Sequence, residues 1–481
     1  MNLLIVLKIL GVLLLCEAAA LLPSVAVAVI YQEAAVYAFI KTIVIAAFLG
    51  FLLYSIKPQD KMIRYKEGFA IVSFGWIAAS LIGALPFLFS GALTSPVDAF
   101  FETVSGFTTT GATVISNVEA LPKCLLFWRS FTHWLGGMGI LVLTLAISPA
   151  LGLGTFQILK AESPGPISSK LTAKVSDTAK ILYITYLVFT VVMILFLWLG
   201  GMPLFDTLCH TFGTLGTGGF SVKNASIGAY DNVYYEIVIT VFMLLAGVNF
   251  SLYYLAFKKR SLAELWRDKE LQVYLGIVAV YILVITFNLY GSVFSSFAES
   301  LRHAFFQVGS IISTTGYATT DFDLWPDLSR TLLLTLMFIG ACAGSTAGGM
   351  KVIRIYLIFK YIQREIGTLI HPRLVKAVKV NDEIIPESVL SSVMSFSLLF
   401  LLVFITATLL LLTQNLDIVS AVSAVACTLG NIGPGLNALG PTKTFAPVSE
   451  MAKCLLSACM LLGRLELYTM ISLLFPSFWR K

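Results

Sequence analysis

Residues 108–113 read TTTGAT and interrupt a chain in which most stretches of this length are apolar. The chain has 481 residues, of which 58% are hydrophobic and only 12% are charged, and its mean hydropathy is +0.90. A soluble domain carries about 25% charged residues. Apolar runs near the length that crosses a bilayer recur along the whole sequence. The sequence therefore predicts an integral membrane protein in which this Thr/Gly stretch is a local break in helical structure.

The same kind of stretch occurs four times. Residues 98–113, DAFFETVSGFTTTGAT, align without gaps with residues 303–318, HAFFQVGSIISTTGYA. A looser copy surrounds GTGGFS at 216–221, and the loosest is SAVSAVACTLGNIGPG at 420–435. One Thr-Gly pair is ordinary loop chemistry, but four with the same flanking pattern indicate an internal repeat. This alignment matches Thr110-Gly111 with Thr217-Gly218, Thr315-Gly316 and Ile432-Gly433.

Two kinds of connection join the apolar runs. Four outer connections, 95–118, 203–225, 297–322 and 416–440, each hold an apolar stretch too short to span and suited to a re-entrant half-helix. The other connections are basic, and positive loops stay in the cytoplasm, which places both termini there and the acidic Asp321, Asp323 and Asp327 outside. The basic groups are Lys57, Lys61, Arg64 and Lys66; Lys160, Lys170, Lys174 and Lys180; residues 258–269; residues 351–379; and Arg480 with Lys481. The ten predicted spans are 3–30, 34–56, 69–92, 124–150, 180–201, 233–257, 272–292, 328–360, 389–413 and 450–475.

The predicted fold is an all-α polytopic membrane protein. It has four tandem helix–pore-loop–helix repeats in a pseudo-four-fold arrangement, preceded by two extra transmembrane helices at 1–60. We number the repeats 1 to 4 in chain order, and we call the Thr/Gly stretch of each repeat its segment. Repeats 1 to 4 cover 61–165, 166–262, 263–372 and 373–481, and segments 1 to 4 are 108–113, 215–220, 313–318 and 430–435.

The repeated break indicates a cation pathway. Backbone that leaves helical geometry inside a membrane must be buried in protein or line a water-filled cavity, and a ring of its carbonyl oxygens can replace the hydration shell of an ion. Half-helices that enter from outside point their partly negative C-terminal ends at the bilayer centre. No ring of carboxylates accompanies the segments, which argues against Ca²⁺ or Mg²⁺. The sequence has no HExxH, no GxSxG and no cluster of His or Cys, so an enzyme is not expected.

Further motifs carry a resemblance to a known family. They are FWRSFTHWLGGMGILVL at 127–143, AGVNFSLYY at 246–254, GACAGSTAGGMKVIR at 340–354 and LGRLELYT at 462–469. Together with the four segments they resemble the Trk/Ktr/HKT superfamily of potassium transporters. The two extra leading spans make the TrkH-type membrane subunit the nearest match.

The resemblance implies potassium uptake across the inner membrane of a prokaryote, with K⁺ as the transported ion. It implies a homodimer that lies in membrane lipid, with one pore per protomer. It also implies a cytosolic TrkA-type regulatory ring that binds NAD or ATP, and no nucleic-acid partner. Glycine in all four segments favours K⁺, since relatives that prefer Na⁺ have serine at the first position. The ion-binding residues implied are Thr110, Gly111, Thr217, Gly218, Thr315, Gly316, Ile432 and Gly433.

The stretch at 340–350 is predicted to be an intramembrane gate loop, with Gly344, Ser345, Thr346, Gly348 and Gly349 weakening helix continuity. From the residues alone, a small-residue seam for close helix packing is the alternative. The resemblance favours the gate.

Arg464 stands near the middle of the last predicted span, where a charge is costly and should face the bundle or the pore. Snorkelling is the alternative. The resemblance places this arginine below the segments, where it would weaken ion binding and speed release. An ion-coupled symporter, driven by H⁺ or Na⁺, stays open as an alternative function, with Arg464 and Glu466 as its candidate relay. The chain departs from the family pattern at His133, where glutamine is usual, and at Ala341 and Ala347, where glycines are expected.

Overall fold

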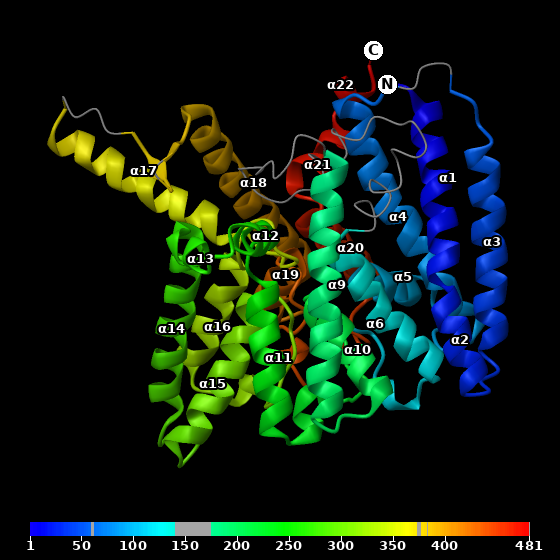
Figure 1. Cartoon of the computed structure of the whole chain (residues 1–481), viewed down its shortest axis with the longest axis horizontal. Helices are drawn as coiled ribbons and strands as arrows, with labels where there is room; N and C mark the ends of the chain where they lie inside the picture. The colour runs from blue at the N-terminus through cyan, green and yellow to red at the C-terminus, as the bar shows by residue number, and fades with distance from the viewer. Residues whose placement is uncertain (59–61, 140–174, 373–376, 382, 481) are drawn as a thin grey trace.

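The computed structural model describes residues 1–58, 62–139, 175–372, 377–381 and 383–480. Most of this part of the chain is helical (Figure 1). Within it, six helices are long and apolar enough to cross a membrane, or up to eight if each of two bent helix pairs is one crossing. The predicted lysines Lys160, Lys170 and Lys174 lie outside the described residues.

The N-terminal extension is a helical hairpin at one edge of the bundle (Figure 1). Helices α1 (Leu3–Ala20) and α2 (Leu22–Ile30) form one apolar run, and α3 (Val36–Tyr54) returns beside α1. A Cβ added to Gly11 of α1 would lie 2.7 Å from the Gly50 carbonyl oxygen of α3. Small residues at this crossing therefore let the two backbones touch, as is typical of helix pairs in membranes.

Each repeat contributes a long first helix, a half-helix and a second helix. The first helices are α4 (Tyr65–Phe89), α9 (Val175–Leu199), α14 (Lys269–Leu289) and α18 (Glu387–Leu412). The half-helices are α5 (Pro96–Phe107), α10 (Leu204–Leu215), α15 (Phe297–Ile312) and α19 (Ile418–Leu429). After each segment comes a short 3₁₀ turn: η1 (Val118–Ala120), η3 (Ser226–Tyr230), η4 (Phe322–Leu324) and η5 (Asn437–Leu439).

The second helices of repeats 2, 3 and 4 are broken. The break in repeat 3 falls at the predicted loop, whereas the breaks in repeats 2 and 4 interrupt spans that were predicted to be straight. In repeat 2, α11 (Val233–Ala246) and α12 (Phe250–Lys259) meet at 88°. In repeat 4, α20 (Glu450–Arg464) meets α21 (Leu467–Ile471) and η6 (Ser472–Leu474) at 118°, and α22 (Pro476–Trp479) follows.

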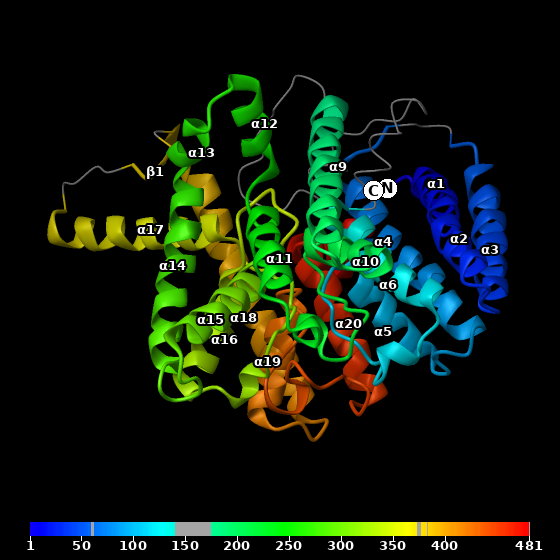
Figure 2. The same ribbon diagram turned by 60° about the horizontal axis from the view of Figure 1, so that its bottom comes forward.

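In repeat 3, α16 (Asp327–Ile339) and α17 (Val352–Ile370) are separated by the loop at 340–351. Helix α17 runs beyond the predicted end at 360 and projects from the bundle (Figure 2). In repeat 1, α6 (Lys123–Gly137) ends early in the predicted span 124–150, whose residues 140–150 lie outside the described part of the chain.

Two short elements connect the repeats. Helix α13 (Ala263–Arg267) precedes α14, and a two-stranded antiparallel hairpin of β1 (Lys379–Val380) and β2 (Glu383–Ile384) precedes α18. The hairpin is a small exception to the predicted all-helical fold. It forms because Val378, Val380 and Ile385 bury their side chains against Ile353 and Leu357 of α17.

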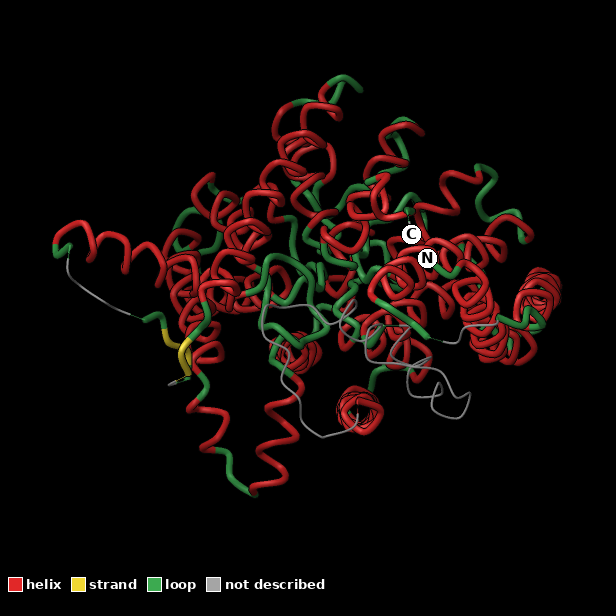
Figure 3. Tube along the Cα trace, turned by 90° about the horizontal axis from the view of Figure 1, so that it is seen from above, coloured by secondary structure: helices red, strands yellow, loops and turns green. Residues whose placement is uncertain are grey.

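Loops occupy the centre of the molecule, and helices surround them in the view from above (Figure 3). Many polar side chains in and next to the four segments are fully buried, although loops usually lie on surfaces. Those with no exposed area include Thr108, Thr109, Thr110, Thr217, Ser313, Thr314, Thr315 and Asn431. Buried irregular backbone of this kind needs internal partners or a cavity lined by its polar groups.

Candidate ion pathway

The four segments share one backbone conformation. In each, a non-glycine residue with positive φ stands two positions before a glycine with positive φ. A left-handed conformation is uncommon for threonine, so its recurrence marks a turn that the surrounding structure imposes. The pairs are Thr109 (55°) with Gly111 (80°), Thr217 (55°) with Gly219 (79°), Thr314 (56°) with Gly316 (86°) and Asn431 (55°) with Gly433 (103°).

The same backbone hydrogen bond closes every turn. The amide of the residue before the glycine donates to the carbonyl oxygen five residues earlier, at the end of the half-helix. These bonds run from Thr110 to Ser105 (2.9 Å), Gly218 to Gly213 (2.8 Å), Thr315 to Ser310 (2.9 Å) and Ile432 to Cys427 (2.8 Å).

Both observations correct the register of segment 2 by one residue. The sequence alignment matches Gly218 with Gly111, whereas the turn and its hydrogen bond match Gly219 with Gly111 and Gly218 with Thr110. The stretch GTGGFS offers two adjacent glycines, and the flanking sequence is too divergent to choose between them. The equivalent of segment 1 is therefore residues 216–221, and Thr217 takes the place of Thr109.

The four turns close into a ring. Each positive-φ glycine lies against a carbonyl group of the next segment, and no side chain would fit there. A Cβ at Gly111 would lie 2.0 Å from Gly218 O, at Gly219 2.0 Å from Thr315 O, at Gly316 1.8 Å from Ile432 O, and at Gly433 2.6 Å from Thr110 O. One cavity is lined by all four of these glycines. The segments thus converge on one axis, with a carbonyl group of each beside its neighbour.

One rim of this ring is cross-linked between neighbouring repeats. Arg129 of repeat 1 pairs with buried Glu102 (Nε to Oε1, 2.8 Å) and donates to the Ser221 carbonyl oxygen of repeat 2 (3.3 Å). The Gly228 amide of repeat 2 donates to Ala318 O of repeat 3 (3.1 Å).

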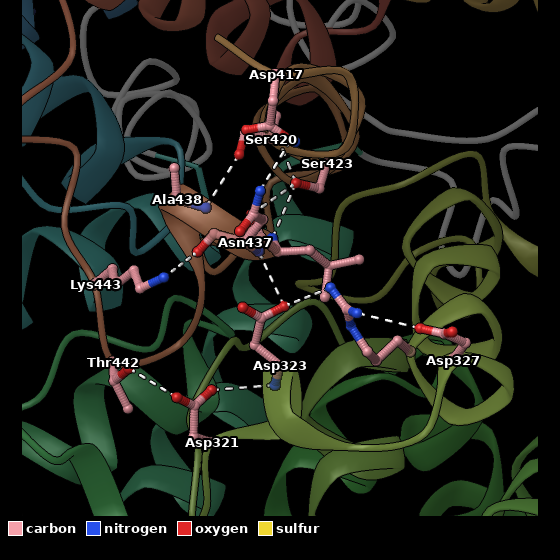
Figure 4. Close-up of polar contacts among 12 residues, drawn as sticks. Asp321, Asp323, Asp327, Asp417, Ser420, Ser423, Asn437, Ala438, Thr442 and Lys443 are labelled. Atoms are coloured by element: carbon pink, nitrogen blue, oxygen red, sulfur yellow. Dashed lines mark hydrogen bonds and ion pairs between the residues drawn. The ribbon is translucent and has the colours of Figure 1, made fainter.

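Repeat 4 completes the cross-links on both of its sides. Figure 4 shows Asp321 and Asp323 of repeat 3 bonded to repeat 4, through the Thr442 hydroxyl (3.0 Å) and the Asn437 amide (3.0 Å). Asp323 and Asp327 both pair with Arg330, so all three predicted outer acids serve as structural contacts. The Phe445 amide closes the circle by donating to Thr113 O of repeat 1 (2.8 Å).

A second ring lies next to the segments, where the second helices break. We call residues 136–139, 247–249, 340–351 and 464–466 the helix-break ring. The Arg464 guanidinium of repeat 4 donates to Thr346 O of repeat 3 (2.6 Å) and to Gly137 O of repeat 1 (3.0 Å). In repeat 2, the Gly247 carbonyl accepts from Cys342, and the Phe250 amide donates to Gly344 O, each at 3.0 Å. Repeats 2 and 4 therefore hold the loop at 340–351 directly, and Arg464 links it to repeat 1.

This loop also contacts the segments directly. The Gly348 amide donates to the Thr314 hydroxyl of segment 3 (2.7 Å), and a Cβ on Gly348 would lie 2.4 Å from Gly430 O of segment 4. Gly344 and Gly349 both have a φ of 73°. The predicted Gly344, Ser345, Thr346, Gly348 and Gly349 line or border one cavity with Arg464, so the structure brings the candidate gating residues together.

Charged side chains anchor the two ends of the loop. Glu270 of α14 accepts from the amides of Ala343 (2.7 Å) and Ile353 (3.2 Å) with one oxygen. Arg354 of α17 pairs with Glu466 (2.6 Å), which lies in the break between α20 and α21. The buried Lys351 ammonium donates to the Ala347 carbonyl oxygen.

Sequence reasoning missed the anchor Glu270, the glycine Gly219 and the break at 247–249. The signal for Glu270 was an acid at the start of an apolar helix.

The two departures from the family pattern in the loop, Ala341 and Ala347, are explained by the structure. Both residues are buried at ordinary negative φ, where a methyl group fits. The cavity beside the loop is lined by Lys351, Arg354 and Arg464 against one acid, Glu466.

Comparison with known proteins identifies the family. Residues 35–480 match the family model TrkH, described as a cation transport protein. The chain belongs to the TrkH family. The Trk system potassium uptake protein TrkH of Salmonella typhimurium is 40% identical to this TrkH-family chain over 98% of this chain and 99% of the relative. The protein of the same name from Halomonas elongata is 39% identical over the full length of both.

A solved structure agrees. The crystal structure of the potassium transporter TrkH from Vibrio parahaemolyticus matches this TrkH-family chain with a TM-score of 0.90 and 38% identity over all of both chains. The predicted resemblance and the predicted polytopic membrane fold are thus confirmed. Membership of a family of cation transport proteins also confirms a transporter rather than an enzyme.

Proposed function

We propose that this chain carries potassium ions into the cell through a pore formed within one chain. Its TrkH relatives are named as potassium uptake proteins, and they match over nearly the whole length. The observation that carries the proposal is the closed ring in which every segment glycine contacts a carbonyl group of the next segment. Such a ring presents peptide oxygens to an ion stripped of water.

The proposed selectivity filter uses the corrected register. Its ion-binding positions are Thr110-Gly111, Gly218-Gly219, Thr315-Gly316 and Ile432-Gly433, with Thr217 supplying the preceding turn. The glycines of all four repeats have positive φ, a conformation that disfavours any side chain. K⁺ is the proposed cargo.

The proposed gate is the loop at 340–350. Its contacts with Thr314 and Gly430 place a change of loop conformation next to segments 3 and 4. Arg464 would hold the loop closed and lower the affinity for a cation in the adjoining cavity, because a fixed positive charge repels it.

Orientation and partners follow the same proposal. Both termini lie at one end of the bundle (Figure 1), the end that we propose faces the cytoplasm of a prokaryotic cell because of its basic loops. The proposed assembly is a homodimer in the inner membrane with a TrkA-type cytosolic ring that binds NAD or ATP. The repeat boundaries at 61–165, 166–262, 263–372 and 373–481 belong to this proposal.

Uptake of radioactive rubidium into proteoliposomes tests the filter. We expect Gly111→Ser and Gly316→Ser to weaken the preference for K⁺ over Na⁺ as competitor. Gly91→Ser and Gly291→Ser are matched controls, since both glycines have positive φ (74° and 77°) but nothing within 4 Å of an added Cβ. Unchanged ion preference in both filter variants would remove the basis of the proposal.

The same vesicles separate a pore from an ion-coupled symporter. A pore gives reversal potentials that follow the K⁺ gradient alone. Displacement of the reversal potential by imposed pH or Na⁺ gradients would instead indicate coupling.

A further inference from the structure

Segment 2 lacks side chains that segments 1 and 3 share. In segment 1 the hydroxyls of Thr108 and Thr110 are 2.8 Å apart, and in segment 3 those of Ser313 and Thr315 are 2.7 Å apart. All four residues are fully buried. Each pair braces its turn from within, because a hydrogen bond joins the residue before the glycine to the end of the half-helix.

The equivalent positions in segment 2 are Gly216 and Gly218, so this brace is missing there. The imidazole of His133, from α6 of repeat 1, fills the space. A Cβ on Gly218 would lie 2.3 Å from both Cγ and Nδ1 of His133. The His133 carbonyl oxygen would lie 2.3 Å from a Cβ on Gly216. The imidazole and Gly218 are therefore sterically matched, whereas Gly216 leaves room for the backbone of residue 133.

His133 also contacts the residue on the other side of Gly219. Its ring stacks on Phe220 with centroids 4.2 Å apart and planes 20° from parallel. The Phe220 amide donates to His133 Nδ1 at 3.4 Å, which places the proton of a neutral imidazole on Nε2. The Arg129 guanidinium lies 4.1 Å from the Phe220 ring centroid. His133 is fully buried, and its Nε2 has no hydrogen-bond partner among the residues that the structure describes.

We infer that His133 of repeat 1 is a positioning residue that holds the turn of segment 2, where the hydroxyl pair of segments 1 and 3 is missing. By holding this turn it helps to set ion preference. The inference rests on the proposed filter. Two features of the ring act together. Its volume replaces the missing side chains, and Nδ1 holds the Phe220 amide beside Gly219. Glutamine can offer a similar acceptor through its side-chain oxygen, whereas alanine offers neither volume nor acceptor.

Complementary variants test the steric match by rubidium uptake into proteoliposomes. Gly218→Thr alone should lose most uptake, because the new side chain meets the imidazole. His133→Ala with Gly218→Thr should regain a large part of it, since removal of the imidazole makes room for the threonine that segments 1 and 3 carry at this position. Full activity of Gly218→Thr alone, or a double variant no better than Gly218→Thr while eluting as monodisperse protein, would overturn the inference.

Single variants at His133 test ion preference independently of that rescue. We expect His133→Ala to increase competition by Na⁺ several-fold, and His133→Gln to stay close to the parent protein. A control is His303→Ala, because His303 also stacks on a phenylalanine, Phe294 (4.8 Å, 22°), but lies outside the segments. Equal Na⁺ competition in the parent, His133→Ala and His303→Ala proteins would contradict a role in selectivity.

Gly111→Ser, measured in the same experiment, separates failure of the proposed filter from failure of the proposed role of His133. A changed ion preference in Gly111→Ser with no effect in the His133 series leaves the filter in place and rejects the positioning role. No effect in Gly111→Ser rejects the filter itself, and the positioning role with it.

Discussion

The Arg464 guanidinium donates a hydrogen bond to the Thr346 carbonyl oxygen at 2.6 Å. The same side chain reaches the Gly137 carbonyl oxygen at 3.0 Å. One residue of repeat 4 thus ties the loop of repeat 3 to the end of α6 in repeat 1. Carbonyl oxygens on two repeats compensate a charge that is otherwise costly inside a membrane. A side chain placed in this way can keep the loop in the conformation seen here.

Removal of this tie is expected to open the pathway. Hydrogen bonds to charged groups contribute about 1.5–3 kcal/mol, and about 1.4 kcal/mol is a tenfold change in an equilibrium. Arg464→Gln should therefore raise rubidium flux through the partner-free protein by roughly tenfold. Arg364→Gln is the control. Arg364 lies far along α17 from the loop and pairs with Glu365 of the same helix and with Glu387 of α18. An unchanged flux through well-folded Arg464→Gln would contradict the gating role.

Glu270 is expected to stabilise the closed loop from its other side. Glu270→Ala leaves the buried Ala343 and Ile353 amides without their acceptor, at a cost of about 1–3 kcal/mol for an unsatisfied group. We expect a lower melting temperature and a higher partner-free flux. Glu270→Gln keeps an acceptor oxygen and should lie between the alanine variant and the parent. Normal melting and normal flux in Glu270→Ala would show that the loop does not depend on this anchor.

The sequence predicted the order of the elements and three of the four segment registers. Both depend on local signals: apolar length, short half-helices and the Thr-Gly pattern. The register of segment 2 was predicted wrongly because Gly218 and Gly219 are adjacent. Only the folded turn selects between them, through the positive φ of Gly219 and the hydrogen bond from Gly218 to Gly213. That bond depends on where α10 ends, which the sequence does not fix to one residue.

The helix breaks were harder to predict for a different reason. Only the glycine-rich loop at 340–350 carries a strong local signal, whereas 247–249 and 464–466 carry only isolated polar or charged residues within otherwise apolar stretches. Their free backbone groups find partners distant in sequence, as when the Phe250 amide donates to Gly344 O. Hydropathy averaged over a window does not detect such a break. The contact that compensates the free backbone groups lies in another repeat, so the local sequence does not show it.

The buried Glu102–Arg129 pair is expected to be critical for stability. Glu102 accepts from Arg129 Nε (2.8 Å), the Thr113 hydroxyl (2.9 Å) and the Val114 amide (3.0 Å), so it links α5, segment 1 and α6. Removing one partner of a buried ion pair costs about 3–5 kcal/mol, because the other charge is left uncompensated. Glu102→Gln should lower the melting temperature of the detergent-solubilised protein by several degrees.

Two comparisons make that result specific. Glu102→Gln combined with Arg129→Gln should lose less than the sum of the single losses, since no unpaired charge remains. Lys223→Gln removes a partly exposed pair with Glu119 (3.7 Å) and should change stability by about 1 kcal/mol or less. Additive losses in the double variant would mean that the ion pair itself is not what stabilises the rim.

Asp417 is expected to give a pH-dependent contribution to stability at the N-terminal end of α19. Its carboxylate accepts from the Ser420 amide (3.2 Å) and from Asn437 Nδ2 (2.9 Å), capping the half-helix. The hydrogen bonds with Ser420, and then that with Asn437, hold the pKa of this carboxyl below its usual value. Because the folded pKa is lower than the unfolded pKa of about 3.9, the charged form stabilises the fold above that pH. This contribution disappears as the pH falls through the folded pKa.

Asp417→Asn isolates the charge, because asparagine is also a good N-cap, whereas Asp417→Ala removes the cap and should cost about 0.5–2 kcal/mol. Melting temperatures measured from pH 7 to pH 3 should show the parent above Asp417→Asn at neutral pH and the two converging as the pH falls. A constant difference between them across this range would mean that Asp417 stays charged throughout or acts by shape alone. An alanine variant as stable as the parent at pH 7 would show that α19 does not need its cap.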